Sequence, residues 1–268
     1  MSIESSPHRQ TGRVLVTGGA RRLGAAVCRA FAAAGWEVLC HYRHSLEDAV
    51  GLCAALRACG ARAHALPGDL ESEAGRAAFM PRASPVGPVD ALINNASSFE
   101  PDDAQDFDPA AAMRQLEVNL IAPLSLARLM LRVPHAGAAR PCVVHVLDQK
   151  VFNLNPDYFS YTVSKLALER AVALQAQALA PRARVCGVAP GLMYPSGPQT
   201  AENFERARRA NLLREPIDPD AVAQTCVFLA GNPAITGTTV AVDCGQHLVP
   251  TPRDILFVVD ELLKDPKA

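Results

Sequence analysis

Long apolar runs are missing from this sequence, and so is an excess of either charge. No stretch of roughly 18 uninterrupted apolar residues occurs, and Met1 to Gln10 is polar, so we expect neither a membrane span nor a secretory signal. The formal net charge is −1, which gives no overall field that would attract nucleic acid or an anionic membrane. We therefore expect a soluble, cytoplasmic protein with no nucleic-acid or membrane partner.

Closely spaced cysteines are missing as well. The eight cysteines are scattered and no two form a C-x-x-C pair, so we expect no metal site and interpret them as small buried apolar side chains in a reducing compartment. The sequence shows no internal repeat, low-complexity block or break in composition. These absences predict one domain across residues 1–268, with a short polar arm at 1–11 and a tail at 250–268.

Short β-branched runs alternate with longer Ala/Leu-rich stretches along the chain. This alternation is typical of βαβ units, and it predicts an α/β fold with a single doubly wound, Rossmann-type parallel sheet of about seven strands flanked by helices. Three prolines predict a loop at 81–88, and the apolar tail predicts a short helix on this subunit or on a neighbour. The expected strands are 13–17, 37–42, 61–66, 91–93, 142–147, 184–189 and 239–242, and the expected helices are 23–34, 46–59, 113–131, 158–180 and 218–230.

A glycine-containing turn follows the first expected strand and opens the first expected helix. Glycines there let the backbone approach a pyrophosphate, whose negative charge the helix N-terminus stabilises. The spacing differs from G-x-G-x-x-G, because Gly18 and Gly24 lie six positions apart with Arg22 between them. A purely structural turn is the alternative, but the position in a βαβ unit favours dinucleotide binding. The residues assigned to this turn are Gly18, Arg21, Arg22, Leu23 and Gly24.

The end of the second expected strand indicates which dinucleotide binds. Folds that select NADH place a carboxylate there to bind the ribose 2′-hydroxyl. In this chain the first carboxylate after that strand comes only at Glu47. Arg43 and Arg22 can form charge-assisted hydrogen bonds with a 2′-phosphate, so we predict NADPH as the cofactor; a solvated basic loop is the alternative. The candidate residues are His41, Tyr42, Arg43, His44 and Ser45.

Tyr161 and Lys165 lie four positions apart in an expected helix, so they share one helical face. A phenol has an unperturbed pKa of about 10 and is a poor proton carrier at neutral pH. A nearby ammonium group favours the phenolate and lowers that pKa. The pair therefore indicates a proton-transfer site, with an ordinary surface helix pair as the alternative.

This chain resembles the short-chain dehydrogenase/reductase family from about residue 12 to residue 248. The motifs that occur in the order found in that family are Thr17-Gly18 with Gly24, Asn94-Asn95-Ala96, Asn119, Tyr161 with Lys165, and Pro190-Gly191. The resemblance implies that Tyr161 donates or accepts the proton at the reacting atom, and that Lys165 holds the nicotinamide ribose and tunes Tyr161. It also implies that Asn119 supports a water-mediated proton relay, with a helix-interior amide as the alternative. The further cofactor residues that it implies are Asp69 and Leu70 near the adenine, together with Asn95, Ala96, Ser97, Pro190, Gly191 and Leu192.

Most members of that family carry a serine about thirteen positions before the tyrosine, where this chain has Asp148. A hydroxyl donates a hydrogen bond to a ketone oxygen, whereas an ionised carboxylate only accepts and repels the negative charge that develops there. A carboxylate instead suits a basic nitrogen heterocycle that must receive a proton. An aspartate that caps the loop after the fifth strand is the alternative.

The set of Asp148, Tyr161 and Lys165 resembles that of the pteridine reductases and dihydromonapterin reductases. Arg22 in the glycine turn and the segments 41–45, 94–99 and 245–247 agree with that subgroup. The resemblance implies that Phe99 stacks a pterin against the nicotinamide and that Ser97 contacts both; an ordinary loop aromatic is the alternative for Phe99. The substrate-binding candidates are Ser97, Phe99, Asp148 and Tyr161.

We therefore expect hydride transfer from NADPH that reduces a dihydropterin to a tetrahydropterin. A carboxylate-rich rim of Glu100, Asp102 and Asp103 favours a neutral hydroxylated substrate side chain over the polyglutamate tail of folate. The alternatives are a generic carbonyl reductase for 3-oxoacyl or quinone-like substrates and a regulator that binds NADPH without turnover. Family members are commonly tetramers, so by analogy we expect a homotetramer through the helices at 113–131 and 158–180.

Overall fold

One parallel sheet forms the centre of the molecule. The computed structural model describes residues 12–83, 87–135, 140–197 and 199–262. Its strands are β1 (Arg13–Val16), β2 (Glu37–Tyr42), β3 (Ala63–Pro67), β4 (Ala91–Asn94), β5 (Cys142–Val146), β6 (Arg184–Pro190) and β7 (Thr239–Val242). They pair in the order β3-β2-β1-β4-β5-β6-β7. The strand order reverses between β1 and β4, and ligands of such sheets bind at this switch point, outside the carboxyl ends of the strands.

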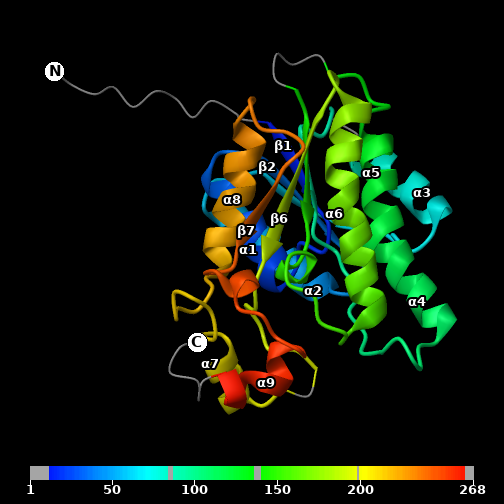
Figure 1. The fold of residues 1–268 in the computed structure, drawn as a ribbon. Helices are drawn as coiled ribbons and strands as arrows, with labels where there is room; N and C mark the ends of the chain where they lie inside the picture. Colours follow the sequence, from blue (N-terminus) through cyan, green and yellow to red (C-terminus); the bar gives the residue numbers. More distant parts are fainter. Residues whose placement is uncertain (1–11, 84–86, 136–139, 198, 263–268) are drawn as a thin grey trace.

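Helices cover both faces of the sheet (Figure 1). They are α1 (Arg22–Ala33), α2 (Leu46–Ala58), α3 (Glu73–Ala83), α4 (Pro109–Leu116), α5 (Ala122–Met130), α6 (Phe159–Leu179), α7 (Ala201–Ala207), α8 (Pro219–Gly231) and α9 (Ile255–Leu262), with a π-helix η1 (Glu117–Ile121) and 3-10 helices η2 (Gln149–Val151) and η3 (Gln246–Leu248). Because α7 follows β6 and α9 follows β7, these two helices lie beyond the carboxyl ends of the strands (Figure 1).

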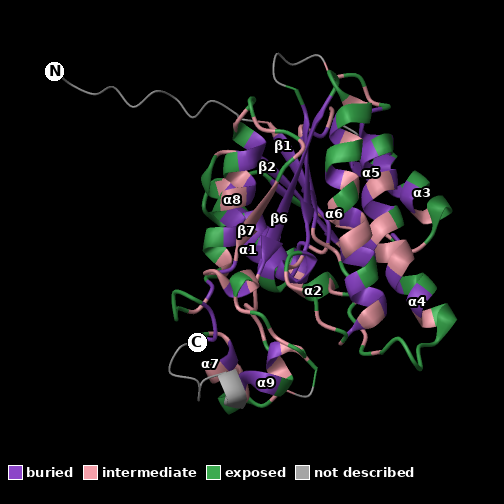
Figure 2. Cartoon of the chain, in the orientation of Figure 1, coloured by how far each residue is buried: buried purple, intermediate pink, exposed green. Residues whose placement is uncertain are grey.

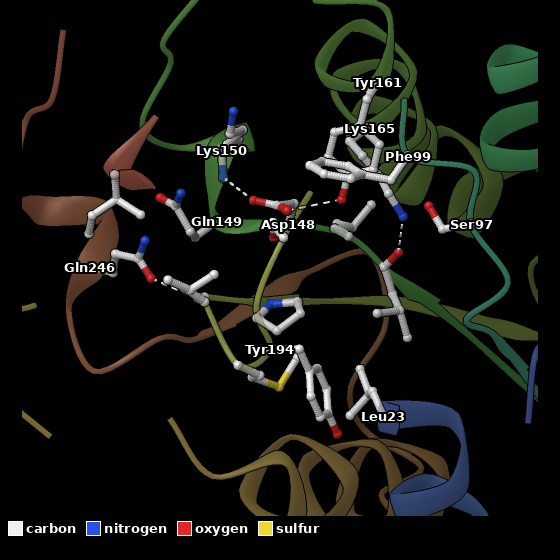
Figure 3. A pocket seen from close by; sticks show the side chains of 18 of the residues that line it. Leu23, Ser97, Phe99, Asp148, Gln149, Lys150, Tyr161, Lys165, Tyr194 and Gln246 are labelled. Carbon is white, nitrogen blue, oxygen red and sulfur yellow. Dashed lines mark hydrogen bonds between the residues drawn. The ribbon is translucent and has the colours of Figure 1, made fainter. Parts of the chain in front are cut away.

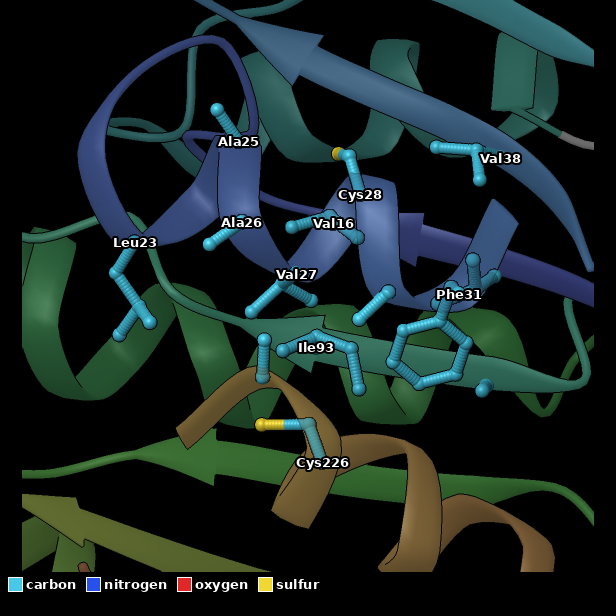
Figure 4. Packing of buried hydrophobic residues seen from close by; sticks show 14 of the residues in the cluster. Val16, Leu23, Ala25, Ala26, Val27, Cys28, Phe31, Val38, Ile93 and Cys226 are labelled. Carbon is cyan, nitrogen blue, oxygen red and sulfur yellow. The ribbon is translucent and has the colours of Figure 1, made fainter. Parts of the chain in front are cut away.

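The core lies on both sides of the sheet, where Figure 2 shows the strands as buried. In β1, Val14 and Val16 pack with α1, α2 and α8, whereas Leu15 packs with α3, α5 and α6. Alternate residues of a strand point to opposite faces, so one strand serves both clusters. Figure 4 shows Val16 and Ile93 of the sheet near Phe31 of α1. Burial on both faces explains why the strands are almost continuously apolar in sequence.

The expected α/β fold with seven strands is confirmed, and the strands predicted at 37–42 and 239–242 agree with the structure at both ends. The loop predicted at 81–88 is wrong at 81–83, because these residues end α3; residues 84–86 lie outside the described part. Pro81 interrupts only the last turn of α3, whose preceding residues Phe79 and Met80 are buried. The helix predicted at 113–131 is divided by η1, and neither α3 nor α7 was expected.

The tail packs on its own subunit. Ile255 and Val259 of α9 form a small apolar cluster with Ala207 and Ala210, and Leu192 packs against it. Six of the eight cysteines are buried as expected, but Cys59 is exposed and Cys244 is half-buried. Across the described ranges, no helix is both long enough and apolar enough to cross a membrane.

Candidate active site

A cavity of about 440 Å³ lies at the carboxyl ends of the central strands (Figure 3). Its walls come from the turn after β1 and from the segments that follow β4, β5 and β6, and residues 249–255 close its far side. These segments are distant in sequence, and the parallel sheet brings them to one edge. A cavity of this size at a switch point is typical of a cofactor and substrate site.

Hydrogen bonds hold the glycine turn between β1 and α1. Gly18 has a φ of +60°, in the left-handed region that favours glycine. The Asn95 side-chain amide donates to the carbonyl oxygens of Thr17 and Gly18, at 2.9 and 3.1 Å. A Cβ at Gly24 would lie 2.1 Å from the Gly18 carbonyl oxygen, so glycine is required for α1 to start this close to the turn. The turn therefore presents its backbone to the cavity in a fixed shape, and it fits a pyrophosphate.

Arg22 replaces the usual middle glycine and adopts a φ of +49°. A residue with a Cβ loses about 1–2 kcal/mol in this conformation. Its guanidinium carbon lies 5.8 Å from the centre of the Tyr194 ring, and both side chains line the cavity. Arg21 also lines the cavity, but it forms an exposed ion pair with Asp48, with 2.6 Å between Nη2 and Oδ2. A strained arginine in a cavity wall indicates a ligand-binding role, and an anionic group is its natural partner.

His41 differs from the expected phosphate-binding residue. Its Nδ1 accepts a hydrogen bond from the Gly18 backbone N–H at 3.1 Å, and its Nε2 is 3.2 Å from the Gly68 carbonyl oxygen, to which it donates. Burial lowers the pKa of His41 to about 4, so the ring is neutral at neutral pH. His41 therefore offers no positive charge to a 2′-phosphate and instead fixes the position of Gly18.

Arg43 is the exposed cation at the end of β2. Its guanidinium pairs with the Glu71 carboxylate and lies 3.9 Å from Asp69 Oδ1. Exposed ion pairs of this kind contribute little free energy, about 0–1 kcal/mol. A doubly charged 2′-phosphate can therefore compete with Glu71 for the guanidinium.

The expected cofactor residues fall into two groups. Those expected around the pyrophosphate and nicotinamide line the cavity, and so does Arg22, which was expected at the 2′-phosphate. The others expected near the adenine and its 2′-phosphate lie outside the cavity, and this division matches an extended dinucleotide. The lining group is Gly18, Arg21, Arg22, Leu23, Gly24, Asn95, Ala96, Ser97, Lys165, Pro190, Gly191 and Leu192, and the outer group is His41, Tyr42, Arg43, His44, Ser45, Asp69 and Leu70.

The turn after β6 is held by a glutamine from η3. Gln246 Oε1 accepts a hydrogen bond from the Leu192 backbone N–H at 2.9 Å. A Cβ at Gly191 would lie 2.4 Å from the same oxygen, so the close approach requires glycine at this position. Gln246 thus fixes the wall that Pro190 and Gly191 form.

Asp148 and Tyr161 are in direct contact (Figure 3). The Tyr161 hydroxyl donates to Asp148 Oδ2 at 2.9 Å, and the Lys150 backbone N–H donates to Asp148 Oδ1 at 2.9 Å. One carboxylate oxygen therefore caps η2 while the other binds the phenol. The capping contact that the loop interpretation expects is present, and the chemical role of Asp148 stays a prediction.

Lys165 lies one helical turn from Tyr161, with Nζ 5.6 Å from the centre of the phenol ring. Its Nζ donates to the Val146 carbonyl oxygen at 2.8 Å, which anchors the side chain to β5. Lys165 is buried, and burial lowers its pKa to about 8 although the Asp148 carboxylate acts in the opposite direction. Its ammonium group therefore loses its proton at a much lower pH than that of an exposed lysine.

The expectation that Lys165 lowers the pKa of Tyr161 is wrong for this structure. Burial and the adjacent Asp148 carboxylate both disfavour the phenolate, and they raise the pKa of Tyr161 well above its ordinary value. Burial also raises the pKa of Asp148. The site therefore holds a protonated phenol hydrogen-bonded to a carboxylate that takes up a proton more readily than usual. Such a pair suits delivery of a proton to a basic acceptor.

Asn119 lies in the π-helix η1, beside the cavity rather than in its wall. Its amide nitrogen donates to the Ser98 carbonyl oxygen and to Ser164 Oγ, at 2.8 and 3.0 Å. Its carbonyl oxygen accepts from the Ser98 backbone N–H and from Ser97 Oγ, at 2.8 and 3.0 Å. The side chain thus positions the segment that carries Ser97, and its part in a water-mediated relay stays a prediction. π-Helical turns of this kind are frequent at functional sites.

Phe99 lines the cavity with one edge near the proton-carrying residues. Its ring stacks on Tyr158, with 4.2 Å between centroids, and meets the Tyr161 ring edge-on at 4.6 Å. The side chain is 39% exposed, so part of the ring stays open to a ligand. Stacking of a pterin on Phe99 stays a prediction that this geometry permits.

Comparison with known proteins identifies the family. A model described as enoyl-(acyl carrier protein) reductase matches residues 18–247. The chain belongs to the short-chain dehydrogenase/reductase family. Pteridine reductase 1 from Leishmania tarentolae is 30% identical over 87% of this chain and 96% of its own length. Dihydromonapterin reductase from Citrobacter koseri is 29% identical over 88% of this chain and 96% of its own length.

A solved structure is similar throughout. The FolM alternative dihydrofolate reductase 1 from Brucella canis, in complex with NADP, is 37% identical, with a TM-score of 0.85. The match covers 91% of this chain and 97% of that chain. The resemblance to short-chain dehydrogenases/reductases and to pterin reductases that the motifs indicated is therefore confirmed.

The motifs of the short-chain dehydrogenase/reductase family do not include the far wall of the cavity. Gln149 and Lys150 follow Asp148 directly and line the cavity with it, and Asp254 and Ile255 reach it from the tail. The first two residues could have been suspected from their position after Asp148. The tail residues carry no sequence signal, because only the packing of α9 on α7 places them there.

The carboxylate-rich rim that the sequence predicted around the substrate is wrong. Glu100, Asp102 and Asp103 do not line the cavity. The Asp102 carboxylate instead accepts from the Ser160 backbone N–H, at 3.1 Å, in the first turn of α6. These charges are used to fix a loop, so a preference for a neutral substrate cannot rest on them.

Proposed function

We propose that this protein reduces a dihydropterin to a tetrahydropterin with NADPH as the reductant. The observation that carries the proposal is the hydrogen bond between Tyr161 and Asp148, at the position where most short-chain reductases have a serine. The relatives named dihydromonapterin reductase and pteridine reductase support the same function, and so does the NADP complex of the FolM reductase.

The residues present fit NADPH. Gly18 and Gly24 leave room for the pyrophosphate against the start of α1, and Arg43 and Arg22 supply positive charge for a 2′-phosphate. When bound, NADPH supplies the hydride. Lys165, which lines the cavity, would hold the ribose next to the nicotinamide. Because NADPH supplies the hydride, the protein itself must supply the proton.

The proton comes from the pair of Tyr161 and Asp148. A ring nitrogen that gains electron density on hydride transfer becomes more basic, and it takes a proton from the nearest acid. Tyr161 keeps its proton until the transfer because its pKa is raised, and it then gives that proton to the ring nitrogen. Asp148, whose pKa is also raised, takes up a proton from water in the cavity and passes it to the Tyr161 phenolate, which returns the pair to its starting state. Phe99 offers its ring face to hold the flat heterocycle against the nicotinamide.

We also propose that the enzyme acts in the cytoplasm as a homotetramer. Four large apolar side chains on α4, η1 and α6 are exposed, namely Met113, Ile121, Val163 and Leu174. Exposed apolar side chains that gather on neighbouring helices are typical of an interface. Light scattering of the purified protein tests this, and a mass equal to one subunit contradicts it.

One assay decides between pterin reduction and reduction of an ordinary carbonyl compound. NADPH oxidation is followed with dihydromonapterin, dihydrobiopterin, dihydrofolate and an acetoacetyl thioester as separate substrates. We expect turnover of at least one dihydropterin and little or none of the thioester, because Asp148 repels the negative charge that develops on a ketone oxygen. Turnover of the thioester alone contradicts the proposal, and turnover of none favours a regulator that only binds NADPH.

A further inference from the structure

Gln149 carries an unpartnered acceptor in the wall of the cavity. Five buried side-chain polar atoms of the described residues lack a hydrogen-bond partner, and among them only Gln149 Oε1 belongs to a residue that lines the cavity. The residue is only 7% exposed. Buried polar groups in native proteins are almost always hydrogen-bonded, so a buried acceptor without a partner, in a residue of the cavity wall, points to a ligand that the side chain turns to meet. Figure 3 shows Gln149 in the same short segment as Asp148 and Lys150.

The polar groups next to Gln149 are already paired within the protein. Lys150 Nζ donates to Asn155 Oδ1 at 3.0 Å and to the Asp157 carbonyl oxygen at 3.1 Å, and it lies 2.8 Å from Asp254 Oδ2. An ammonium group has three hydrogens, so its donors are used. The Asp254 carboxylate is neutralised by the same contact. Among the described residues that line this end of the cavity, none offers a free cation to a carboxylate, and Gln149 offers a neutral acceptor.

A hydroxyl group is the ligand group that fits this environment. It is uncharged, it can donate to Gln149 Oε1, and it can also accept from the amide nitrogen if the amide is rotated. Asp148 marks the position of the reacting ring, and Gln149 is the next residue along the wall. A substituent on the ring that extends along η2 thus meets the Gln149 amide.

We infer that Gln149 determines substrate specificity by accepting a hydrogen bond from a hydroxyl on the ring substituent. This inference rests on the proposed function and names the substrate class: dihydropterins with a neutral, hydroxylated side chain. The carboxylates of Glu100, Asp102 and Asp103 do not line the cavity, so Gln149 rather than this rim accounts for the preference for a neutral side chain.

The test measures how one substitution changes kcat/KM for two different substrates. Gln149→Met keeps the length of the side chain and removes the acceptor. With dihydromonapterin, whose substituent carries hydroxyl groups, kcat/KM should fall about tenfold, as expected for one lost hydrogen bond. With 6-methyl-7,8-dihydropterin, which lacks these hydroxyl groups, kcat/KM should stay within about twofold of the wild-type value.

Control variants separate recognition from structure. Gln149→Glu keeps an acceptor and should keep the preference for the hydroxylated substrate, whereas Gln224→Met on the exposed side of α8 should change neither rate. The Tm of Gln149→Met should equal or exceed that of the wild type, because an unpartnered buried polar atom contributes nothing to stability.

The possible outcomes are distinct. If kcat/KM of Gln149→Met falls equally with both substrates, or falls with neither, Gln149 does not determine specificity and the inference is overturned. The proposed function still stands in that case, provided that the wild type turns over both dihydropterins. A lower Tm with parallel losses on both substrates makes Gln149 structural and overturns the inference in the same way. If the wild type reduces neither dihydropterin, the proposed function fails, and the inference fails with it.

Discussion

The two ends of the cavity are built differently. At the end near β1, Asn95 and His41 hold the glycine turn by hydrogen bonds between neighbouring strands, and glycines allow the close approach. At the other end, the wall comes from η2 and from the tail, and the buried Oε1 of Gln149 in this wall has no hydrogen-bond partner. The first end is shaped to hold one cofactor, whereas the second combines paired charges with the Gln149 acceptor, to which we assign the selection among substrates.

Tyr161→Phe should have the largest effect and should affect only the chemical step. The change removes the hydroxyl that donates to Asp148. Loss of a positioned proton donor lowers kcat by about 10²–10⁴-fold. NADPH binding, followed by the change in nucleotide fluorescence, should remain near the wild-type value because the glycine turn is untouched. A kcat within tenfold of the wild type removes Tyr161 from the proton-transfer step.

Arg43→Ala should weaken the binding of NADPH and leave the binding of the dihydropterin unchanged. Hydrogen bonds to charged groups contribute about 1.5–3 kcal/mol, so KM for NADPH should rise about 10–100-fold. KM for NADH should hardly change, and KM for the dihydropterin should not change. Arg82→Ala, at an exposed position on α3, is the matched control. An equal rise for NADH and NADPH contradicts recognition of the 2′-phosphate by Arg43.

The pH profile of kcat/KM should decrease on the alkaline side. The folded pKa of Lys165 is lowered to about 8, below its ordinary value, so the ammonium group is present below that pH and is lost as pH rises through it. The rate should then fall about tenfold per pH unit, because each unit above the pKa removes nine-tenths of the charged form. Lys165→Arg should move this decrease beyond the measured range, since arginine keeps its charge. A profile that stays level up to pH 10 contradicts a charged Lys165 in the reaction.

Arg253→Ala should have the smallest effect of these substitutions, and the effect should be limited to the binding of the dihydropterin. Arg253 pairs with Asp157 at 2.6 Å, next to Asp254 in the wall, but its side chain is 52% exposed. Such a pair contributes about 0.2–1 kcal/mol, so KM for the dihydropterin should rise no more than about fivefold. Affinity for NADPH, measured by titration, should be unchanged. A larger effect on NADPH than on the substrate would show that the two ends are not separate.

The cofactor end could be predicted from the sequence because its residues are close to one another along the chain. The alternation of strands and helices fixes where β1 ends, and Gly18, Arg22 and Gly24 follow within eight positions. The same local reasoning placed Tyr161 beside Lys165 and located Asp148. It failed for His41, because burial of the ring, which makes it neutral, depends on how α3 packs over β2.

The substrate end could not be predicted in the same way. Asp254 reaches the cavity only because Lys150 and the α7–α9 contact hold the tail there, and no local pattern encodes that contact. The raised pKa of Tyr161 was missed for a related reason. Spacing showed that Lys165 is near, but the effect of burial and of Asp148 became visible only from the three-dimensional arrangement.

The proposed proton transfer to a dihydropterin depends most on Asp148, and Asp148→Ser tests it most directly. Steady-state kcat/KM is measured for the wild type and the variant with dihydromonapterin and with an acetoacetyl thioester, both at saturating NADPH. We expect kcat/KM of the variant to fall about 10²-fold or more with the dihydropterin, because the substitution removes the acid beside Tyr161. With the thioester, kcat/KM should rise or stay unchanged, because the serine hydroxyl can donate to a carbonyl oxygen. Dihydropterin reduction that stays near the wild-type rate would contradict the chemical role of Asp148 and leave it as a residue that only caps η2.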